Sequence, residues 1–233
     1  KGIALDTGLH YVGGLAPGNS LYPIFKYMNL MDLPWQHLDA EGFDRVMIEG
    51  RNFAYAEGLD NFVEILSHDF PAEREGLRRY ADVMGEIGRH LHDAILPRDE
   101  VDFFNTSLFS QSAYEFLNET FHDPLLRNVL CGSSLKMELD KDTLPLYTFA
   151  QGNNSFIESS WRLKGDGSLL VDSLIEDIRS MGGEVICNAG VQELIEQDGK
   201  LVAALTVNGD RYEADWFISD AHPAVTVDLV KES

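Results

Sequence analysis

The chain is poor in cysteine and in basic residues, and each shortage excludes a class of protein. Cys131 and Cys187 are the only cysteines among 233 residues, and both lie in apolar stretches. This usage predicts two buried free thiols in a reducing compartment and argues against a disulfide framework. The 18 lysines and arginines are outnumbered by 39 aspartates and glutamates, which gives a formal net charge of -21. Because such a charge repels phosphate backbones, we expect no nucleic-acid partner.

Long apolar runs are also missing. No stretch of the sequence approaches the roughly 20 apolar residues that a membrane-spanning helix needs. We therefore expect a cytoplasmic protein whose closest approach to a bilayer is peripheral contact. The composition, with 44% hydrophobic and 10% aromatic residues, predicts a globular core of one large or two small domains. The sequence begins at Lys1 with no initiator methionine, and we interpret it as a piece of a longer protein.

A complete glycine fingerprint for dinucleotides, G-x-G-x-x-G, is absent. Gly165-Asp166-Gly167 matches its first half, but Leu170 stands where the third glycine belongs and no apolar strand precedes the run. We interpret this run as a turn that leads into a helix capped by Ser168. Gly182 would end that helix in a left-handed conformation. Its buried face would carry four apolar residues at helical spacing, Leu170, Leu174, Ile178 and Met181.

Short strands are predicted after this helix. Apolar or alternating runs occur between turn signals at Asp198-Gly199 and Asn208-Gly209. They predict a small β-meander that ends in an apolar strand. The expected strands are Glu184 to Cys187, Gly190 to Ile195, Leu201 to Val207, Arg211 to Ala214 and Trp216 to Ser219.

The first 58 residues are predicted to be rich in strands, apart from a helix over residues 20–31. A short apolar strand enters a loop that contains Gly8, Gly13 and Gly14, where the backbone can approach a ligand closely. Residues 36–39, 43–48 and 52–56 are expected strands, and the last two form a hairpin around Gly50.

Residues 59–163 are predicted to form a helical lobe. Asp60 is the expected cap of its first helix, and further helices are expected over residues 71–96, 112–121, 125–131 and 144–151. Aromatic residues gather in this lobe, where they would either line an apolar cavity or fill an ordinary core. They are Phe103, Phe104, Phe109, Phe116, Phe121, Tyr147, Phe149, Phe156 and Trp161.

Several motifs together resemble FAD-dependent oxidoreductases of the phytoene desaturase, carotenoid isomerase and retinol saturase group. The first is Asp6-Thr7-Gly8-Leu9-His10-Tyr11-Val12-Gly13. The others follow in order towards the end of the chain, at Gly165-Asp166-Gly167, Gly182-Gly183-Glu184-Val185, Val191, Asp198-Gly199-Lys200 and Phe217 to Pro223.

This resemblance implies a fold, a cofactor and a set of site residues. The fold would be α/β with α+β character, and the cofactor would be FAD in the parent protein, with NAD(P) as a further candidate. Gly8 would lie near the flavin, with His10 and Tyr11 as the candidate catalytic residues at the neck of the substrate cavity. Val191 would hold the adenine end through its backbone, and the strand end at Ser219, Asp220 and Ala221 would abut the cofactor.

The resemblance also divides the chain into three parts. Residues 1–58 would begin a substrate domain with mixed β-sheet, residues 59–163 would cover it with helices, and residues 164–233 would return to a partial FAD-binding lobe. Since the family carries its glycine fingerprint before the position of Lys1 and its last flavin segment after that of Ser233, this piece by itself would be inactive and bind no cofactor.

The activity expected of the parent is hydride transfer at a carbon-carbon bond of an apolar polyene or lipid. Two alternatives stay open at the level of sequence: a non-catalytic substrate-binding or interaction module, and an amine-oxidase-like flavoprotein. We predict no metal site, because no histidines, cysteines and carboxylates share a spacing suited to one.

Overall fold

The computed structural model describes residues 10–95, 110–132 and 143–232. Contacts divide the chain into two compact units, Lys1–Leu174 and Ile175–Ser233, with the boundary inside helix α8 (Ser168–Ser180). Each unit combines helices with small sheets, which confirms the predicted mixed class with α+β character.

Two small sheets support the first unit. One has the order β1-β5-β2, from Val12–Gly13, Ser160–Leu163 and Trp35–His37, and both of its pairings are antiparallel. The other is the hairpin of β3 (Asp44–Ile48) and β4 (Arg51–Tyr55). Glu49 and Gly50 at its turn both have positive φ, as a two-residue hairpin turn requires, so the predicted hairpin is confirmed.

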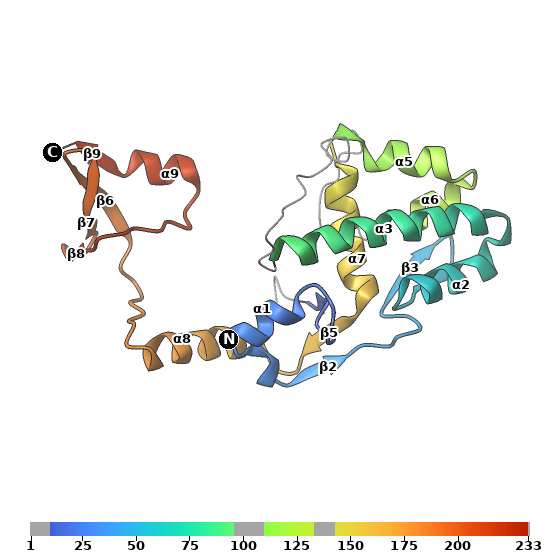
Figure 1. Cartoon of the computed structure of the whole chain (residues 1–233), viewed down its shortest axis with the longest axis horizontal. Coiled ribbons are helices and arrows are strands. Elements are labelled where there is room, and N and C mark those ends of the chain that lie inside the picture. The colour runs from blue at the N-terminus through green and yellow to red at the C-terminus, as the bar shows by residue number, and fades with distance from the viewer. Residues whose placement is uncertain (1–9, 96–109, 133–142, 233) are drawn as a thin grey trace. The chain divides into compact units, whose positions relative to one another are not determined.

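Helices form most of the rest of this unit (Figure 1). They are α1 (Tyr22–Tyr27), the short 3₁₀ turns η1 (Leu30–Asp32) and η2 (Pro71–Glu73), α2 (Leu59–Asp69), α3 (Arg74–Ile95), α5 (Ala113–Thr120), α6 (Pro124–Leu130) and α7 (Leu146–Glu158). Three predicted details are wrong. The first helix ends early because Asn29 is left-handed, with φ of 56°. Gly58 rather than Asp60 precedes α2. Helix α7 continues seven residues beyond the predicted Gln151, to Glu158.

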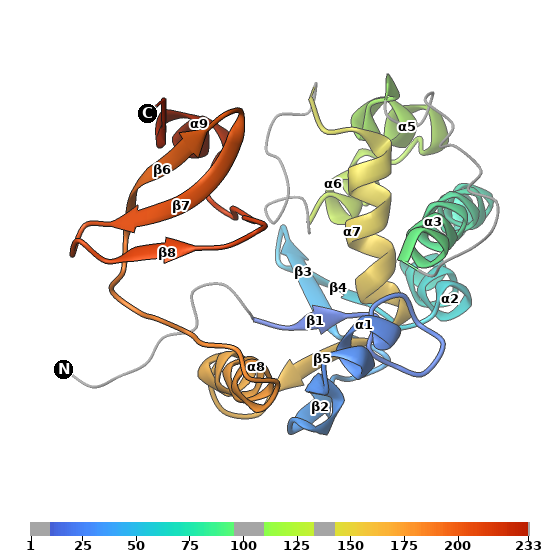
Figure 2. The same ribbon diagram turned by 60° about the vertical axis from the view of Figure 1, so that its left-hand side comes forward.

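The core of the first unit lies where α7 packs against α3 and α2 packs against α3 (Figures 1 and 2). Tyr80 is central to it, with ring centroids 5.9 Å from Phe62 and 6.3 Å from Phe149. Phe116, Phe121 and Phe149 are buried in this cluster, as an ordinary core requires. Each such aromatic removes a large apolar area from water, so this cluster dominates the stability of the unit. Phe103, Phe104 and Phe109 lie outside the described residues.

The second unit is built on one four-stranded sheet of order β8-β7-β6-β9 (Figure 2). Strands β6 (Val191–Gln197), β7 (Lys200–Thr206) and β8 (Arg211–Glu213) form the predicted antiparallel meander. Helix α9 (Pro223–Asp228) then leads into β9 (Val230–Glu232), which pairs with β6 in parallel and was not predicted. The sheet buries few large side chains, with Leu194 as the main apolar one.

Four predictions about residues 164–233 and the two cysteines are wrong. Ser168 is the first residue of α8 rather than its cap, and the Asp166 carboxylate accepts the Ser168 amide at 2.8 Å. No residue of α8 is buried; Leu170 and Leu174 are only half-buried, and Ile178 and Met181 are exposed. Cys187 is exposed and Cys131 half-buried, although both are free thiols. Finally, neither residues 184–187 nor residues 216–219 form strands.

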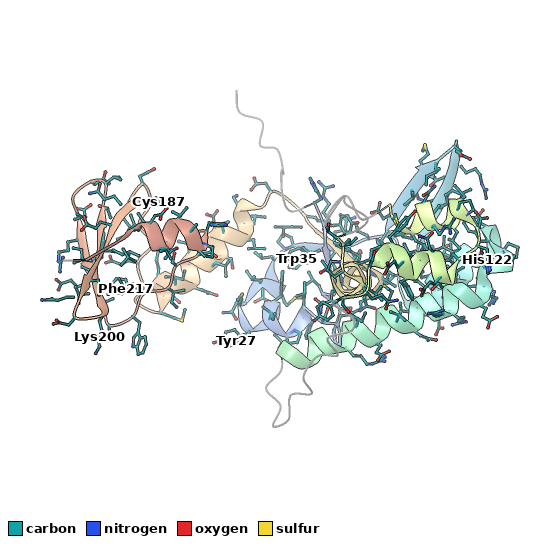
Figure 3. The ribbon with its side chains drawn as sticks, turned by 90° about the horizontal axis from the view of Figure 1, so that it is seen from above. Tyr27, Trp35, His122, Cys187, Lys200 and Phe217 are labelled. Atoms are coloured by element: carbon teal, nitrogen blue, oxygen red, sulfur yellow. The ribbon has the colours of Figure 1, made fainter. Side chains whose placement is uncertain are left out.

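The last of these runs is conspicuous in the second unit. Trp216 is 89% exposed and Ile218 is 99% exposed. Phe217, which lies between them in the sequence and is labelled in Figure 3, is half-buried. An apolar strand needs neighbours that pair with its backbone and cover its faces. Among the described residues of this unit no strand pairs with the run, which explains why its sequence pattern does not become a strand.

Candidate functional site

Tyr11 lies in the first unit, immediately before strand β1. Its ring packs against Phe156 of α7, with centroids 4.8 Å apart. Its hydroxyl donates a hydrogen bond of 2.7 Å to Oδ2 of Asp44, 33 residues later in the chain. Tyr11 is therefore fixed at both the ring and the hydroxyl, as a side chain that positions a ligand must be.

Asp44 is brought to Tyr11 by the β3–β4 hairpin. It is the first residue of β3 and pairs with Tyr55 across the hairpin, and its Oδ1 accepts the amide of Arg45 at 2.9 Å. Since side chains alternate along a strand, Asp44 shares its face with the half-buried Val46 and Ile48. A carboxylate thus occupies a position that the strand pattern assigns to an apolar residue.

The surroundings keep the two phenols at this place neutral. Burial is the largest cause that raises the pKa of Tyr11, and the hydrogen bond to Asp44 and its negative charge raise it further. Tyr55 is fully buried and donates to the carbonyl oxygen of Val129 at 2.5 Å. Burial raises the pKa of Tyr55 as well, with smaller contributions from Tyr80, Cys131, Asp44 and Tyr11. We call Tyr11, Asp44, Tyr55 and Phe156 the Tyr11 cluster.

The loop after β1 is tied to the end of α7 and the start of β5 by polar contacts. Glu158 accepts hydrogen bonds from the amide and the hydroxyl of Ser20 through Oε2, at 3.0 and 2.8 Å. Fully buried Ser159 accepts from the Ala16 amide and donates to Asn19. Gly13 lies directly against the backbone of α7, where a side chain would collide with it. These contacts fix β1, and through it Tyr11, on α7.

His10, the other candidate catalytic residue, is exposed and lies in a bend before β1. Among the residues that the structure describes, no ring stacking or hydrogen bond fixes it in the way that Tyr11 is fixed. A different histidine has the more ordered setting: Nε2 of His37 lies 2.5 Å from Oε2 of Glu57, and its ring stacks on Trp161 at 4.5 Å.

Val191, the predicted adenine contact, begins β6 in the second unit and is 42% exposed. It pairs with Thr206 of β7 on one side. On the other side, β9 pairs only with residues 194–196 of β6 in the described register. The backbone edge at Val191 is thus uncovered within the described part of this unit, which is the geometry that a backbone contact requires.

Ser219, Asp220 and Ala221 form the exposed turn before α9. The Ser219 hydroxyl lies 2.7 Å from that of Thr226 and accepts the Ala221 amide at 3.3 Å. His222 then caps α9, since its Nδ1 accepts the Ala224 amide at 3.2 Å. The side chain of Ser219 therefore shapes this turn. The small side chain of Ala221 and the exposed Asp220 are what the turn presents to a ligand. Gly8 lies outside the described residues.

Two shallow hollows lie away from all of these residues. One, of about 630 Å³, lies over β7 and β8 and includes the side chains of Lys200 and Arg211. The other, of about 290 Å³, lies beside Glu73 and His122 at the far end of the helical lobe. Within the described ranges, no group of three or more metal-ligating side chains is found, and no helix is both long and apolar enough to cross a bilayer.

Comparisons with known proteins add a relationship to this geometry. No family model matches the chain. An all-trans-retinol 13,14-reductase of Danio rerio is 24% identical over 229 residues, which is 89% of this chain and 37% of that protein. The Rattus norvegicus protein of the same name is 28% identical over 100 residues, 41% of this chain. The chain is similar to retinol reductases. It spans only a little over a third of the zebrafish protein that it matches.

Sequence reasoning found Tyr11 but missed Asp44. The signal was present, because Asp44, Val46 and Ile48 alternate in one phase and only the first is charged. What the sequence could not supply was the partner, because the bond joins Tyr11, just before β1, to Asp44, which lies 33 residues later in the hairpin.

Proposed function

We propose that the protein to which this chain belongs is an FAD-dependent oxidoreductase that acts on carbon-carbon bonds of an apolar polyene or lipid. The observation that carries this proposal is an alignment that covers 89% of the chain, at 24% identity, with an all-trans-retinol 13,14-reductase. The motifs at Gly8 to Gly13 and at Phe217 to Pro223 support the same flavoprotein group.

In this proposal, the second unit would hold the adenine end of FAD. The uncovered edge at Val191 would receive the adenine end through backbone groups, and the exposed turn at Ser219, Asp220 and Ala221 leaves room for the dinucleotide. The run Gly165-Asp166-Gly167 does not fit a pyrophosphate, because Asp166 brings a carboxylate to the start of α8. We infer that the remaining contacts to FAD come from parts of the protein beyond this chain, which covers 37% of its zebrafish relative.

The first unit would supply the substrate end. When bound, FAD supplies hydride chemistry at its N5 atom. Tyr11 would contribute a neutral phenol held in a fixed place between Phe156 and Asp44. His10, with Gly8 close by in sequence, would lie at the entrance to the substrate cavity, where its side chain is exposed.

The test uses the full-length protein and all-trans-retinol. We expect flavin absorbance in the purified protein and, under reducing conditions, a product heavier than retinol by one hydrogen molecule. Tyr11→Phe should lower turnover, whereas the matched change Tyr27→Phe, at a tyrosine that is 87% exposed in α1, should not. A full-length protein without bound flavin and without turnover of any polyene would refute the proposal.

We expect the 233-residue chain by itself to bind no stoichiometric FAD, because only the adenine end has a fitting surface. Both the enzyme and the silent module predict this result, so the measurement that separates them is made on the full-length protein. Retention of an apolar ligand by full-length protein that lacks flavin would favour a non-catalytic binding module instead.

A further inference from the structure

The hollow beside Glu73 and His122 contains a buried carboxylate of which only one oxygen is fully used. Glu73, the last residue of η2, is 7% exposed, and its Oε1 accepts hydrogen bonds from the amides of His122 and Asp123 at 2.8 and 2.6 Å. Among the described residues, Oε2 has one charged neighbour, Nδ1 of His122 at 3.9 Å, which is too far for a hydrogen bond. One oxygen of Glu73 therefore holds the turn before α6, and the other faces the hollow.

A second buried polar group lines the same hollow, which we call the Glu73 hollow. Thr120, the last residue of α5, is 8% exposed, and its hydroxyl has no hydrogen-bond partner in the part of the chain that the structure describes. Because buried hydroxyls in native proteins are nearly always hydrogen-bonded, an unpartnered one points to a water, ion or ligand that would complete it. Gly76 brings the start of α3 against the end of α5, since a Cβ there would lie 2.9 Å from the carbonyl oxygen of Thr120. The buried Glu73 and Thr120 thus form the floor of the hollow.

The charges around the Glu73 hollow favour a cation that donates hydrogen bonds. Its rim consists of exposed residues, among them Glu75, Arg79 and His122, which is labelled in Figure 3. The opposite charges of Glu75 and Arg79 offset each other, so the buried carboxylate of Glu73 sets the sign of the site. A carboxylate only accepts hydrogen bonds, and a threonine hydroxyl accepts as well as donates. The floor therefore selects a positively charged donor.

A small primary amine has the matching chemistry. When protonated, it carries a positive charge on a nitrogen with three N–H donors, enough to serve both floor residues and a water. Within the described ranges no group of three or more metal-ligating side chains is found, so an organic cation fits this site better than a metal ion. The hollow, of about 290 Å³, is large enough for a group of a few heavy atoms.

We propose that the Glu73 hollow binds the protonated amino group of a small primary amine, which donates hydrogen bonds to Oε2 of Glu73 and to the hydroxyl oxygen of Thr120. The site lies in the first unit, away from the Tyr11 cluster, and does not depend on the proposed function. It gives Glu73 two tasks, because one oxygen holds the turn before α6 and the other holds the ligand.

The experiment compares ethylammonium with tetramethylammonium as probes of the full-length protein at constant ionic strength. Binding is followed by saturation-transfer difference NMR of the probe protons. The two probes carry the same charge, but only ethylammonium has N–H donors. We expect ethylammonium to bind with a dissociation constant of about 1–10 mM, the range that so small a ligand can reach. It should bind about tenfold more tightly than tetramethylammonium, because hydrogen bonds to a charged group are the strong ones.

Two variants each remove one acceptor from the floor. Glu73→Gln keeps a carbonyl oxygen for the amides of His122 and Asp123 but replaces Oε2 by an NH2 group, so it should weaken ethylammonium binding by about tenfold while the turn stays in place. Thr120→Val removes the hydroxyl and should weaken binding by about threefold to tenfold. Because that hydroxyl has no partner among the described residues, the melting temperature of the unliganded Thr120→Val protein should stay the same or rise.

Matched controls separate the floor residues from general effects. Glu86→Gln and Thr148→Val make the same changes at exposed positions of α3 and α7, and both should leave the dissociation constant of ethylammonium unchanged. A thermal melt of each variant checks folding. If Glu73→Gln fails to fold, Thr120→Val still decides the result.

Three results overturn the inference. The first is a wild-type protein without saturable binding of ethylammonium. The second is equal affinity for tetramethylammonium, which would show that the acidic protein attracts any cation. The third is an affinity for ethylammonium that either floor variant leaves unchanged. Since no flavin or polyene enters this experiment, its failure leaves the proposed function intact, and a failure of the proposed function leaves the amine site intact.

Discussion

Replacing Gly13 by alanine is expected to loosen the attachment of β1 to α7 and with it the position of Tyr11. A Cβ atom at this residue would lie 2.6 Å from the amide nitrogen of Phe156 and closer still to the carbonyl group of Ser155. These neighbours are helix backbone, which cannot turn aside as a flexible side chain can. The strand itself is only two residues long and is held by pairing with Ser160 and Trp161.

The magnitude follows from overpacking against a rigid neighbour, which costs about 1–3 kcal/mol. For a unit of this size each kcal/mol lowers the melting temperature by about 2–4 °C. We therefore expect Gly13→Ala to lower the melting temperature of the first unit by about 2–12 °C, as measured by circular dichroism.

Gly167→Ala is the matched control. No atom lies within 4 Å of a Cβ placed there, and the residue does not have positive φ, so the melting temperature should stay the same or rise slightly. A Gly13→Ala protein that melts with the wild type would show that β1 is not seated on α7 as described.

Two further predictions concern buried polar groups. Glu73 is 7% exposed and accepts hydrogen bonds from the amides of His122 and Asp123 at 2.8 and 2.6 Å. Glu73→Ala should therefore lower the free energy of unfolding, measured by urea titration, by about 1–3 kcal/mol. The control Glu75→Ala, at an exposed glutamate, should change this free energy little, and equal losses in the two variants would contradict the prediction. Burial raises the pKa of Tyr11, Tyr55 and Tyr80 above the ordinary value of 10.0, whereas the same phenols ionise near that value once unfolded. The stability that the folded protein gains from keeping these phenols neutral is therefore complete below pH 10 and should fall as the pH rises further. Tyrosinate absorbance from these residues should appear only as the helical signal is lost. Ionisation of these phenols in the folded protein would contradict their burial.

The candidate site was predictable where it depends on local sequence and not where it depends on a partner. The motif around Tyr11 and the meander after Val191 were recognisable, because glycine turns and alternation act over a few residues. Asp44, the hydrogen-bond acceptor for Tyr11, was not recognisable from the sequence, because it lies in a hairpin 33 residues later in the chain. Helix α7 shows the same limit: Asn153 and Asn154 are poor helix formers, yet both are buried inside a helix that tertiary packing extends.

The sequence alone determined the mixed class, the β3–β4 hairpin, most helices and the left-handed Gly182 after α8, since capping, turn chemistry and periodicity are local properties. Tertiary structure alone decided which short runs find strand partners. Trp216 to Ser219 and Val230 to Glu232 are both short, but only the second meets a strand edge, on β6. It also decided that Asp44 meets Tyr11, because a hydrogen bond between distant residues requires the packing of whole elements to place its two atoms.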